Sequence, residues 1–287
     1  MLTHPNSDSN AAIVIGAGLG GLAAAMRLGA KGYAVTVLDR LDRPGGRGSS
    51  VTQDGHRFDL GPTIITVPQV YEKLWAACGR DFHQDVELRP MDPFYQVRWQ
   101  DGSTFTARQN TKAMLSEIAR LSPHDVKGYL QFLKDSERRY VVGFEGMVAK
   151  PMHRLWETLK VLPTFAMLRA DQSILGLAKR RVKDPRLRMA LSFHPLFIGG
   201  DPRHVTSMYA LVAYLEKEFG GHYAMGGGQA IADAMVKVIR SQGGQVRQGT
   251  EVDEILVEGD AAKGVRLAAG EVIHAPLVIR NEDAGLT

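Results

Sequence analysis

Residues 12–47 read A-I-V-I-G-A-G-L-G-G-L-A-A-A-M-R-L-G-A-K-G-Y-A-V-T-V-L-D-R-L-D-R-P-G-G-R, and this stretch decides the fold of the 287-residue chain. The β-branched run at 13–15 predicts a buried strand. Residues 22–31 predict a helix, and residues 34–38 predict a second strand. This order of strand, helix and strand predicts an α/β fold with a parallel sheet of the Rossmann type.

Three glycines and one acid indicate that this unit binds a ligand. Gly16, Gly18 and Gly21 form the pattern G-x-G-x-x-G, which suits a tight turn, the approach of a pyrophosphate and close packing of the helix on the strand. Asp39 ends the second strand, where a carboxylate hydrogen-bonds ribose hydroxyls. The alternative is a glycine-tolerant βαβ unit without a ligand, but the full context favours dinucleotide binding.

The segment after the acid separates the possible cofactors. Arg40 follows Asp39 directly, and Gly45, Gly46 and Arg47 come a few residues later. A nicotinamide dinucleotide has no need of this glycine pair and arginine, whereas a flavin lying over the loop would use them on its pyrophosphate or ribityl chain. A solvated basic turn is the alternative. We therefore expect FAD, with all four residues near it.

A predicted hairpin follows, with Asp54-Gly55 as its turn. Its exit reaches Thr63 and Ile64, whose backbone we expect at the flavin edge. An ordinary hairpin exit explains the same turn chemistry equally well.

Composition is that of a soluble globular protein, with 44% hydrophobic and 23% charged residues. Cys78 is the single cysteine, so an intrachain disulfide and a redox-active dithiol are both excluded, as fits a reducing cytoplasm. The first ten residues lack the apolar core of a signal peptide. No stretch predicts a membrane-spanning helix, and no metal site is expected.

Positive charge is concentrated in one segment. Residues 150–190 contain ten Lys or Arg and three acids, although the whole chain carries only +4. Trp156, Phe165 and several leucines are interspersed there, a pattern typical of helices that lie in a membrane interface. The alternative is a helical domain that buries its apolar face against the protein. Nucleic-acid binding is disfavoured because no recognised module accompanies the charge.

We predict two domains. Residues 11–82 and 222–287 form a discontinuous FAD-binding domain, and residues 83–221 form an inserted α+β domain for substrate and membrane association. Strands at 86–89, 94–99 and 103–106 suggest a second, antiparallel sheet in the inserted domain. Val252 begins a late strand that we expect to return over the adenine. His194 is the single candidate catalytic side chain, with a structural role as its alternative.

Four stretches resemble the bacterial phytoene desaturases of proteobacterial carotenoid synthesis. These are G-A-G-L-G-G-L-A-A-A-M-R-L-G-A-K-G (16–32), L-D-R-P-G-G-R-G-S-S-V-T-Q-D-G-H-R-F-D-L-G-P-T-I-I-T-V-P (41–68), F-H-P-L-F-I-G-G-D-P (193–202) and T-E-V-D-E-I-L-V-E (250–258). The resemblance covers essentially the whole chain. Amine oxidases and protoporphyrinogen oxidases belong to the same flavoprotein superfamily.

The resemblance implies an FAD-dependent enzyme, peripheral on the inner face of the cell membrane, that introduces successive double bonds into phytoene and later C40 intermediates to give neurosporene or lycopene. Hydride would pass from an allylic carbon to the flavin, and a quinone or oxygen would take the electrons. Gly16, Gly18, Gly21 and Asp39 would bind the ADP half. The other positions carried over are Gly46 and Arg47 for pyrophosphate and ribityl, Thr63 and Ile64 for the flavin, and Val252 for the adenine.

The chain also departs from the family. It reads Arg280-Asn281-Glu282-Asp283 where members usually have S-N-A-D, and members continue well beyond Thr287 with a segment that closes over the flavin. We therefore expect a truncated form that binds FAD weakly at best and does not desaturate phytoene alone. Another FAD-dependent amine-oxidase-type enzyme, or a non-catalytic flavin- or membrane-binding fragment, is the alternative.

Overall fold

The computed structural model describes residues 10–146 and 155–281. The chain divides into two compact units, Met1–Arg89 with His222–Thr287, and Pro90–Gly221. We call them unit 1 and unit 2 and describe each by itself. Unit 1 is discontinuous in sequence, and the whole of unit 2 is inserted into it.

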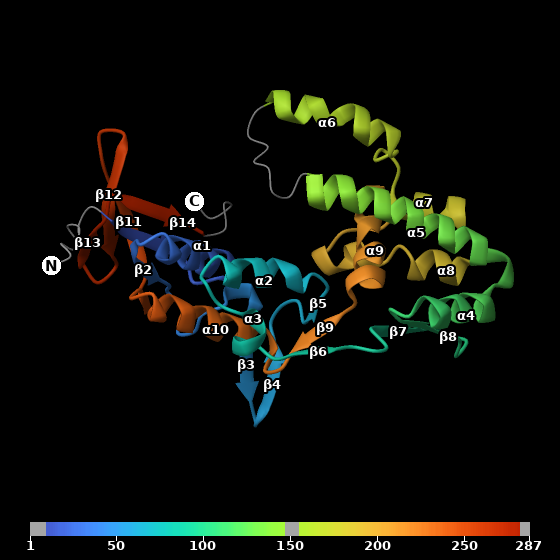
Figure 1. Cartoon of the computed structure of the whole chain (residues 1–287), viewed down its shortest axis with the longest axis horizontal. Coiled ribbons are helices and arrows are strands. Elements are labelled where there is room, and N and C mark those ends of the chain that lie inside the picture. The colour runs from blue at the N-terminus through green and yellow to red at the C-terminus, as the bar shows by residue number, and fades with distance from the viewer. Residues whose placement is uncertain (1–9, 147–154, 282–287) are drawn as a thin grey trace. The chain divides into compact units, whose positions relative to one another are not determined.

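Unit 1 is built on a four-stranded parallel sheet in the order β10-β2-β1-β14. The strands are β1 (Ala11–Ile15), β2 (Ala34–Leu38), β10 (Gln245–Arg247) and β14 (Leu277–Arg280). Helix α1 (Leu19–Ala30) connects β1 to β2, and α10 (Gly227–Ser241) lies alongside it (Figure 1). The predicted α/β fold with a parallel sheet is confirmed.

Apolar side chains explain why these segments pair. In β1 the residues from Ala12 to Ile15 are all buried, as expected of a parallel strand covered on both faces. One face meets a core that contains Leu22 and Met26 of α1 and Ile239 of α10. On the other face Ile13, Ile15 and Leu38 pack against a second, antiparallel sheet of β11 (Val252–Glu258), β12 (Ala261–Leu267) and β13 (Val272–His274).

Two helices extend the core of unit 1. They are α2 (Pro68–Ala76) and α3 (Phe82–Asp85). Trp75 and Phe82 are fully buried and meet edge to face, with ring centroids 5.0 Å apart. The Trp75 indole N–H also donates to Asp85 at 2.8 Å. These contacts lie within unit 1, whose first segment ends at Arg89, whereas the domain boundary after residue 82 stays a prediction.

Smaller sheets complete unit 1. The expected hairpin is present as β3 (Ser50–Gln53) and β4 (His56–Asp59). A three-stranded sheet has the order β5-β9-β6, formed by β5 (Ile64–Ile65), β9 (His222–Ala224) and β6 (Leu88–Pro90). The prediction that β6 joins the strands at 94–99 and 103–106 was wrong. Leu88 packs against the core of unit 1 and draws β6 into the other sheet.

Unit 2 is mostly helical around a two-stranded ribbon, β7 (Tyr95–Arg98) with β8 (Thr104–Ala107). Its α-helices are α4 (Thr111–Leu121), α5 (Val126–Tyr140), α6 (Leu155–Met167), α7 (Ile174–Arg181), α8 (Pro185–Ala190) and α9 (Leu211–Phe219). Short 3₁₀ turns are η2 (Pro123–Asp125), η4 (His194–Ile198) and η5 (Ser207–Ala210), and η3 (Val141–Glu145) is a π-helical turn. Phe105, Phe132 and Ile174 lie at the centre of its core.

Local capping sets where the helices of unit 2 begin. The side chains of Asn110, Ser173 and Asp184 accept hydrogen bonds from backbone N–H groups in the first turns of α4, α7 and α8. Asp125, which is buried, accepts from the N–H groups of Lys183 and Asp184 at 2.7 and 2.8 Å. These bonds tie the start of α5 to the loop before α8.

Candidate functional site

The two glycine loops of the sequence meet in unit 1. Gly18 and Gly45 form an isolated parallel bridge, and Gly45 N–H donates to Ala17 O at 2.8 Å. A methyl group on Gly46 would lie 3.2 Å from the Gly18 Cα, and the φ angle of Gly46 is +54°. The structure therefore joins the G-x-G-x-x-G turn to the Gly-Gly-Arg loop, which the chain separates by two elements.

The first turn of α1 follows this junction. A methyl group on Gly21 would lie 2.0 Å from Gly16 O, so only glycine allows the helix to pack so closely on the turn after β1. No side chain of the described residues caps α1 at Gly18. The first N–H groups of α1 thus lie beside the glycine turn, where a helix start binds phosphate oxygens.

Asp39 connects the end of β2 to the same turn. Its carboxylate is nearly buried and accepts from Ala17 N–H at 2.6 Å and from Leu41 N–H at 2.8 Å. A carboxylate has about four acceptor positions, so ribose hydroxyls can still bind it. Sequence reasoning assigned Asp39 to the ribose and missed its bonds to the protein backbone. Arg40, beside it, is exposed.

The remaining cofactor candidates lie on neighbouring segments of unit 1. Arg47 is exposed in the 3₁₀ turn η1 (Gly46–Gly48). A methyl group on Gly61 would lie 2.0 Å from Arg47 O, so the chain leading to Thr63 touches this turn. Ile64 pairs with Tyr223. The assignment of Thr63 and Ile64 to the flavin stays a prediction.

Val252 begins β11, outside the parallel sheet. Two residues before it, Thr250 N–H donates to Asp39 O at 2.8 Å. Val252 itself packs against the cluster that contains Ile13 and Leu38. The expected adenine contact at Val252 stays a prediction, and this hydrogen bond brings its segment to the acid expected to hold the ribose.

His194 lies in unit 2 and is 1% exposed. Its Nε2 is 3.1 Å from Glu216 Oε1, its ring stacks on Phe193 at 4.6 Å between centroids, and its Nδ1 has no partner among the described residues. Tyr95 O–H donates to Glu216 Oε2 at 3.4 Å. Burial and then the Glu216 carboxylate raise the pKa of Tyr95 well above its usual range. This geometry supports the structural alternative for His194, because its ring is buried and pairs with a partly buried carboxylate of unit 2.

Glu216 was not among the expected residues. It lies on α9 directly after Ala213, Tyr214 and Leu215, and nothing in the local pattern distinguishes it from the neighbouring Glu218. Only the packing of α9 beside His194 identifies it. Buried pairs of this kind form between distant segments, so periodicity alone does not reveal them.

An apolar cavity of about 440 Å³ lies within unit 2. Its lining comes from η3, α6, η5, α9 and the segments after α6 and before η5, and consists of Gly143, Phe144, Phe165, Ala170, Thr206, Met208 and Leu211. The one side-chain hydroxyl in that lining, on Thr206, already donates to Ala170 O at 2.6 Å. The lining therefore suits a hydrocarbon and offers little to a polar ligand.

Buried Arg139 of α5 secures two segments of this wall. Its guanidinium donates to Leu168 O at 2.5 Å and to Ser207 Oγ at 3.1 Å. Arg139 is 3% exposed, and burial lowers its pKa. Arg139 thus links the end of α6 to η5.

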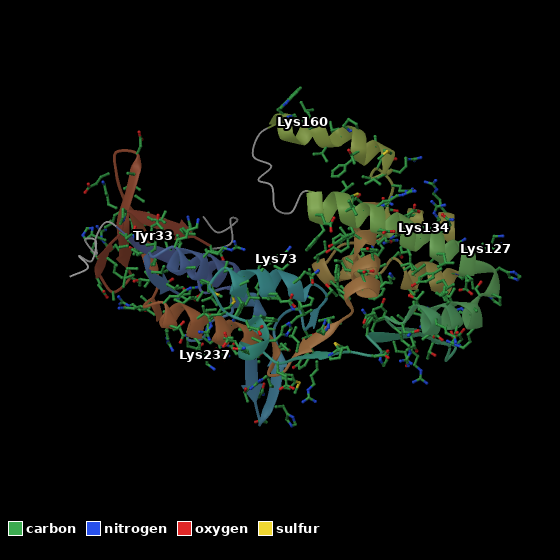
Figure 2. The ribbon with its side chains drawn as sticks, viewed as in Figure 1. Tyr33, Lys73, Lys127, Lys134, Lys160 and Lys237 are labelled. Carbon is green, nitrogen blue, oxygen red and sulfur yellow. The ribbon has the colours of Figure 1, made fainter. Side chains whose placement is uncertain are left out.

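Helix α6 presents apolar side chains to solvent, as in the predicted membrane segment. Trp156, Leu162 and Met167 are 66%, 51% and 76% exposed. Lys160 projects from the same helix and its Nζ is 5.9 Å from the centre of the Trp156 ring (Figure 2). Among the described residues no helix combines the length and apolar character needed to cross a bilayer. The same part of the chain holds no cluster of side chains suited to a metal ion.

Part of the basic charge of unit 2 is neutralised internally. Arg181 pairs with Asp135 at 2.7 Å, Arg186 with Asp184 at 2.9 Å, and Arg169 with Asp171 at 3.1 Å. Residues 150 and 154, which contribute to the predicted charge, lie outside the described residues. Asp171 and Asp184 are among the three acids already counted in residues 150–190, so only the pair with Asp135 reduces the local excess of positive charge further.

Comparison with known proteins identifies relatives over nearly the whole chain. The model of the family described as flavin containing amine oxidoreductase matches residues 19–280. The neurosporene-forming phytoene desaturase of Cereibacter sphaeroides is 68% identical, with 99% of this chain and 55% of the relative covered. The enzyme of the same name from Rhodobacter capsulatus is 63% identical, with 96% and 53% covered.

The fold recurs in solved structures. An oxidoreductase from Methanosarcina mazei is similar with a TM-score of 0.60 and 21% identity, over 94% of this chain and 58% of the other. At that identity the likeness concerns the fold alone. The chain spans about half the length of the curated relatives it matches.

Proposed function

The chain belongs to the flavin containing amine oxidoreductase family, and from that premise we propose that unit 1 holds the FAD of an enzyme that desaturates phytoene to neurosporene. The observation that carries the proposal is the junction of the two glycine loops at Gly18 and Gly45, beside the acid Asp39. Both curated relatives described above are named as neurosporene-forming phytoene desaturases.

The residues of unit 1 fit a dinucleotide. The glycines of the junction place no side chain of their own between the backbone and a pyrophosphate, and the first turn of α1 has no described side-chain cap. Asp39 is aligned by two backbone N–H groups and keeps acceptor positions for ribose hydroxyls. Exposed Arg47 adds a cation beside the glycines. When bound, FAD supplies the hydride acceptor, and the protein contributes orientation and exclusion of water.

An apolar substrate agrees with the cavity of unit 2. Phytoene is a hydrocarbon, and the lining of the 440 Å³ cavity is almost entirely hydrocarbon. A cavity of about 150 Å³ accommodates benzene, so this one has room for on the order of 15 to 18 carbons. It would therefore hold part of a C40 chain and not the whole molecule.

Peripheral membrane binding through α6 is part of the proposal. Trp156, Leu162 and Met167 would enter the interface, with Lys160 near anionic headgroups. Cosedimentation with vesicles containing anionic lipid tests this, and Trp156→Ser should reduce the bound fraction. Equal binding by both proteins would contradict the role of α6.

A quinone or oxygen would accept the electrons.

Flavin binding is the first test. Titration of the 287-residue chain with FAD should quench flavin fluorescence, whereas Gly46→Val should not, because its side chain would collide with Gly18. Absence of binding by the unmutated chain would overturn the proposal.

Activity needs a longer protein for comparison with the relatives. A chimera would join this chain to the remaining part of the Cereibacter sphaeroides enzyme and be supplied with phytoene in a carotenoid-free host. Neurosporene should accumulate. Unchanged phytoene, with the chimera folded and flavin-loaded, would reject the desaturase assignment while leaving FAD binding intact.

A further inference from the structure

Asn281 lies over the glycine turn of unit 1. A methyl group on Gly20, in the first turn of α1, would come within 3.0 Å of Asn281 Nδ2 and 3.1 Å of its Oδ1. A methyl group on Gly16 would lie 2.7 Å from the backbone oxygen of Asn281. The residue thus covers the turn from the side opposite Asp39.

The sheet fixes this position. Asn281 directly follows β14, and its N–H donates to Ile15 O at 2.9 Å, which continues the parallel pairing of β1 with β14. In the order β10-β2-β1-β14 the chain leaves β1 toward β2 on one side, while β14 lies on the other. Ligands of open α/β sheets bind at such a switch point, beyond the carboxyl ends of the strands. Asn281 therefore lies at this switch point.

The carboxamide is available to a ligand. Asn281 is exposed, and no hydrogen bond joins its side chain to another described residue. It has two N–H donors, whereas a diphosphate presents only acceptor oxygens at neutral pH. The N–H groups of α1 approach the crevice from one side and Asn281 from the other, without adding the negative charge that an acid would bring.

We propose that Asn281 is a positioning residue for the diphosphate of the bound dinucleotide, with its side-chain N–H donating to a phosphate oxygen. The inference rests on the proposed FAD function. It assigns to β14, which is distant in sequence from both glycine loops, a direct part in holding the cofactor.

Binding of FAD, ADP and adenosine to the 287-residue chain tests the proposal. For Asn281→Ala the dissociation constants of FAD and ADP should rise about tenfold, as for loss of one hydrogen bond to a charged group. The constant for adenosine, which lacks phosphate, should not change. Asn281→Asp should weaken FAD and ADP further, and the excess over alanine should shrink as salt is raised, because the added effect is repulsion between charges.

Gln245→Ala is the matched control. Gln245 is an exposed amide on β10, at the opposite edge of the same sheet. It should bind all three ligands as the unmutated chain does. Thermal unfolding without ligand should be the same for all variants.

The outcomes separate the two proposals. If the unmutated chain binds FAD and ADP and Asn281→Ala binds them equally well, the role of Asn281 is overturned and the FAD function stands. Equal weakening of adenosine and ADP would also overturn it, because the effect would not arise at the phosphates. If the unmutated chain binds neither FAD nor ADP, both proposals fail.

Discussion

Unit 1 and unit 2 organise polar groups in different ways. The candidate site of unit 1 is made mainly of backbone, with glycines that bring two loops together and one acid that accepts backbone N–H groups. Unit 2 buries side chains against each other, as in the His194–Glu216 pair and the Arg139 contacts. A site made of backbone groups therefore leaves a regular pattern in the sequence, whereas a cluster of side chains from distant segments does not.

Paired glycine substitutions should give the largest effects. A methyl group on Gly21 would lie 2.0 Å from Gly16 O in unit 1, and one on Gly128 would lie 1.8 Å from Arg181 O in unit 2. Backbone atoms cannot move aside as a side chain can, so we expect each alanine variant to lose about 3 kcal/mol of unfolding free energy. Urea unfolding measures this loss.

FAD titration shows whether the two units are independent. Gly21→Ala should abolish FAD binding, and Gly128→Ala should leave it within twofold. Loss of FAD binding in both variants would show that the contrast between the units does not hold.

Glu216→Ala should have the next largest effect. It leaves buried His194 without its partner, which costs about 2 to 3 kcal/mol. His194→Phe leaves the Glu216 carboxylate without its histidine partner, so it should also destabilise unit 2. In the chimera, a catalytic His194 would instead lower turnover without changing the urea midpoint, and that result would contradict the structural role.

Two buried carboxylates give a smaller, matched comparison. Asp39 in unit 1 and Asp125 in unit 2 each accept two backbone N–H bonds from distant or neighbouring segments. Alanine at either position should cost about 2 kcal/mol. Asp39→Ala should also weaken FAD binding at least tenfold, whereas Asp125→Ala should not. Equal FAD affinity for the two variants would remove Asp39 from the site.

The smallest effect concerns alkaline pH. The pKa of Tyr95 is raised in the folded state, first by burial and then by Glu216. Its stabilisation is therefore fully present below its unfolded pKa of about 10 and is lost as pH rises toward the folded value. Tyr95→Phe should raise the pH at which unit 2 unfolds in base, as followed by circular dichroism.

Tyr71→Phe serves as the counterpart in unit 1, since burial also raises the pKa of Tyr71. It should alter the alkaline unfolding of unit 1. If Tyr95→Phe unfolds at the same pH as the unmutated chain, the titration of Tyr95 does not contribute to the loss of stability in base.

Sequence reasoning identified the parts of the fold that depend on local rules. The strands on either side of α1, the hairpin turn at Asp54-Gly55 and the late strand that begins at Val252 were all predicted, because each has a distinct pattern of apolar, glycine or turn residues. The partner of β6 was not predictable, since Leu88 selects its sheet through a core formed by distant residues. Glu216, Arg139 and the cavity of unit 2 were not predicted for the same reason, since each depends on contacts between distant residues.

The discontinuity of unit 1 also bears on how the protein folds during synthesis. β1 and β2 leave the ribosome early, but their sheet neighbours β10 and β14 follow only after all of unit 2. Unit 2 is continuous, so its contacts close over shorter loops and should form first. Until β14 emerges, the edge of β1 is an unpaired strand, and a nascent chain at that stage is a natural client for a chaperone.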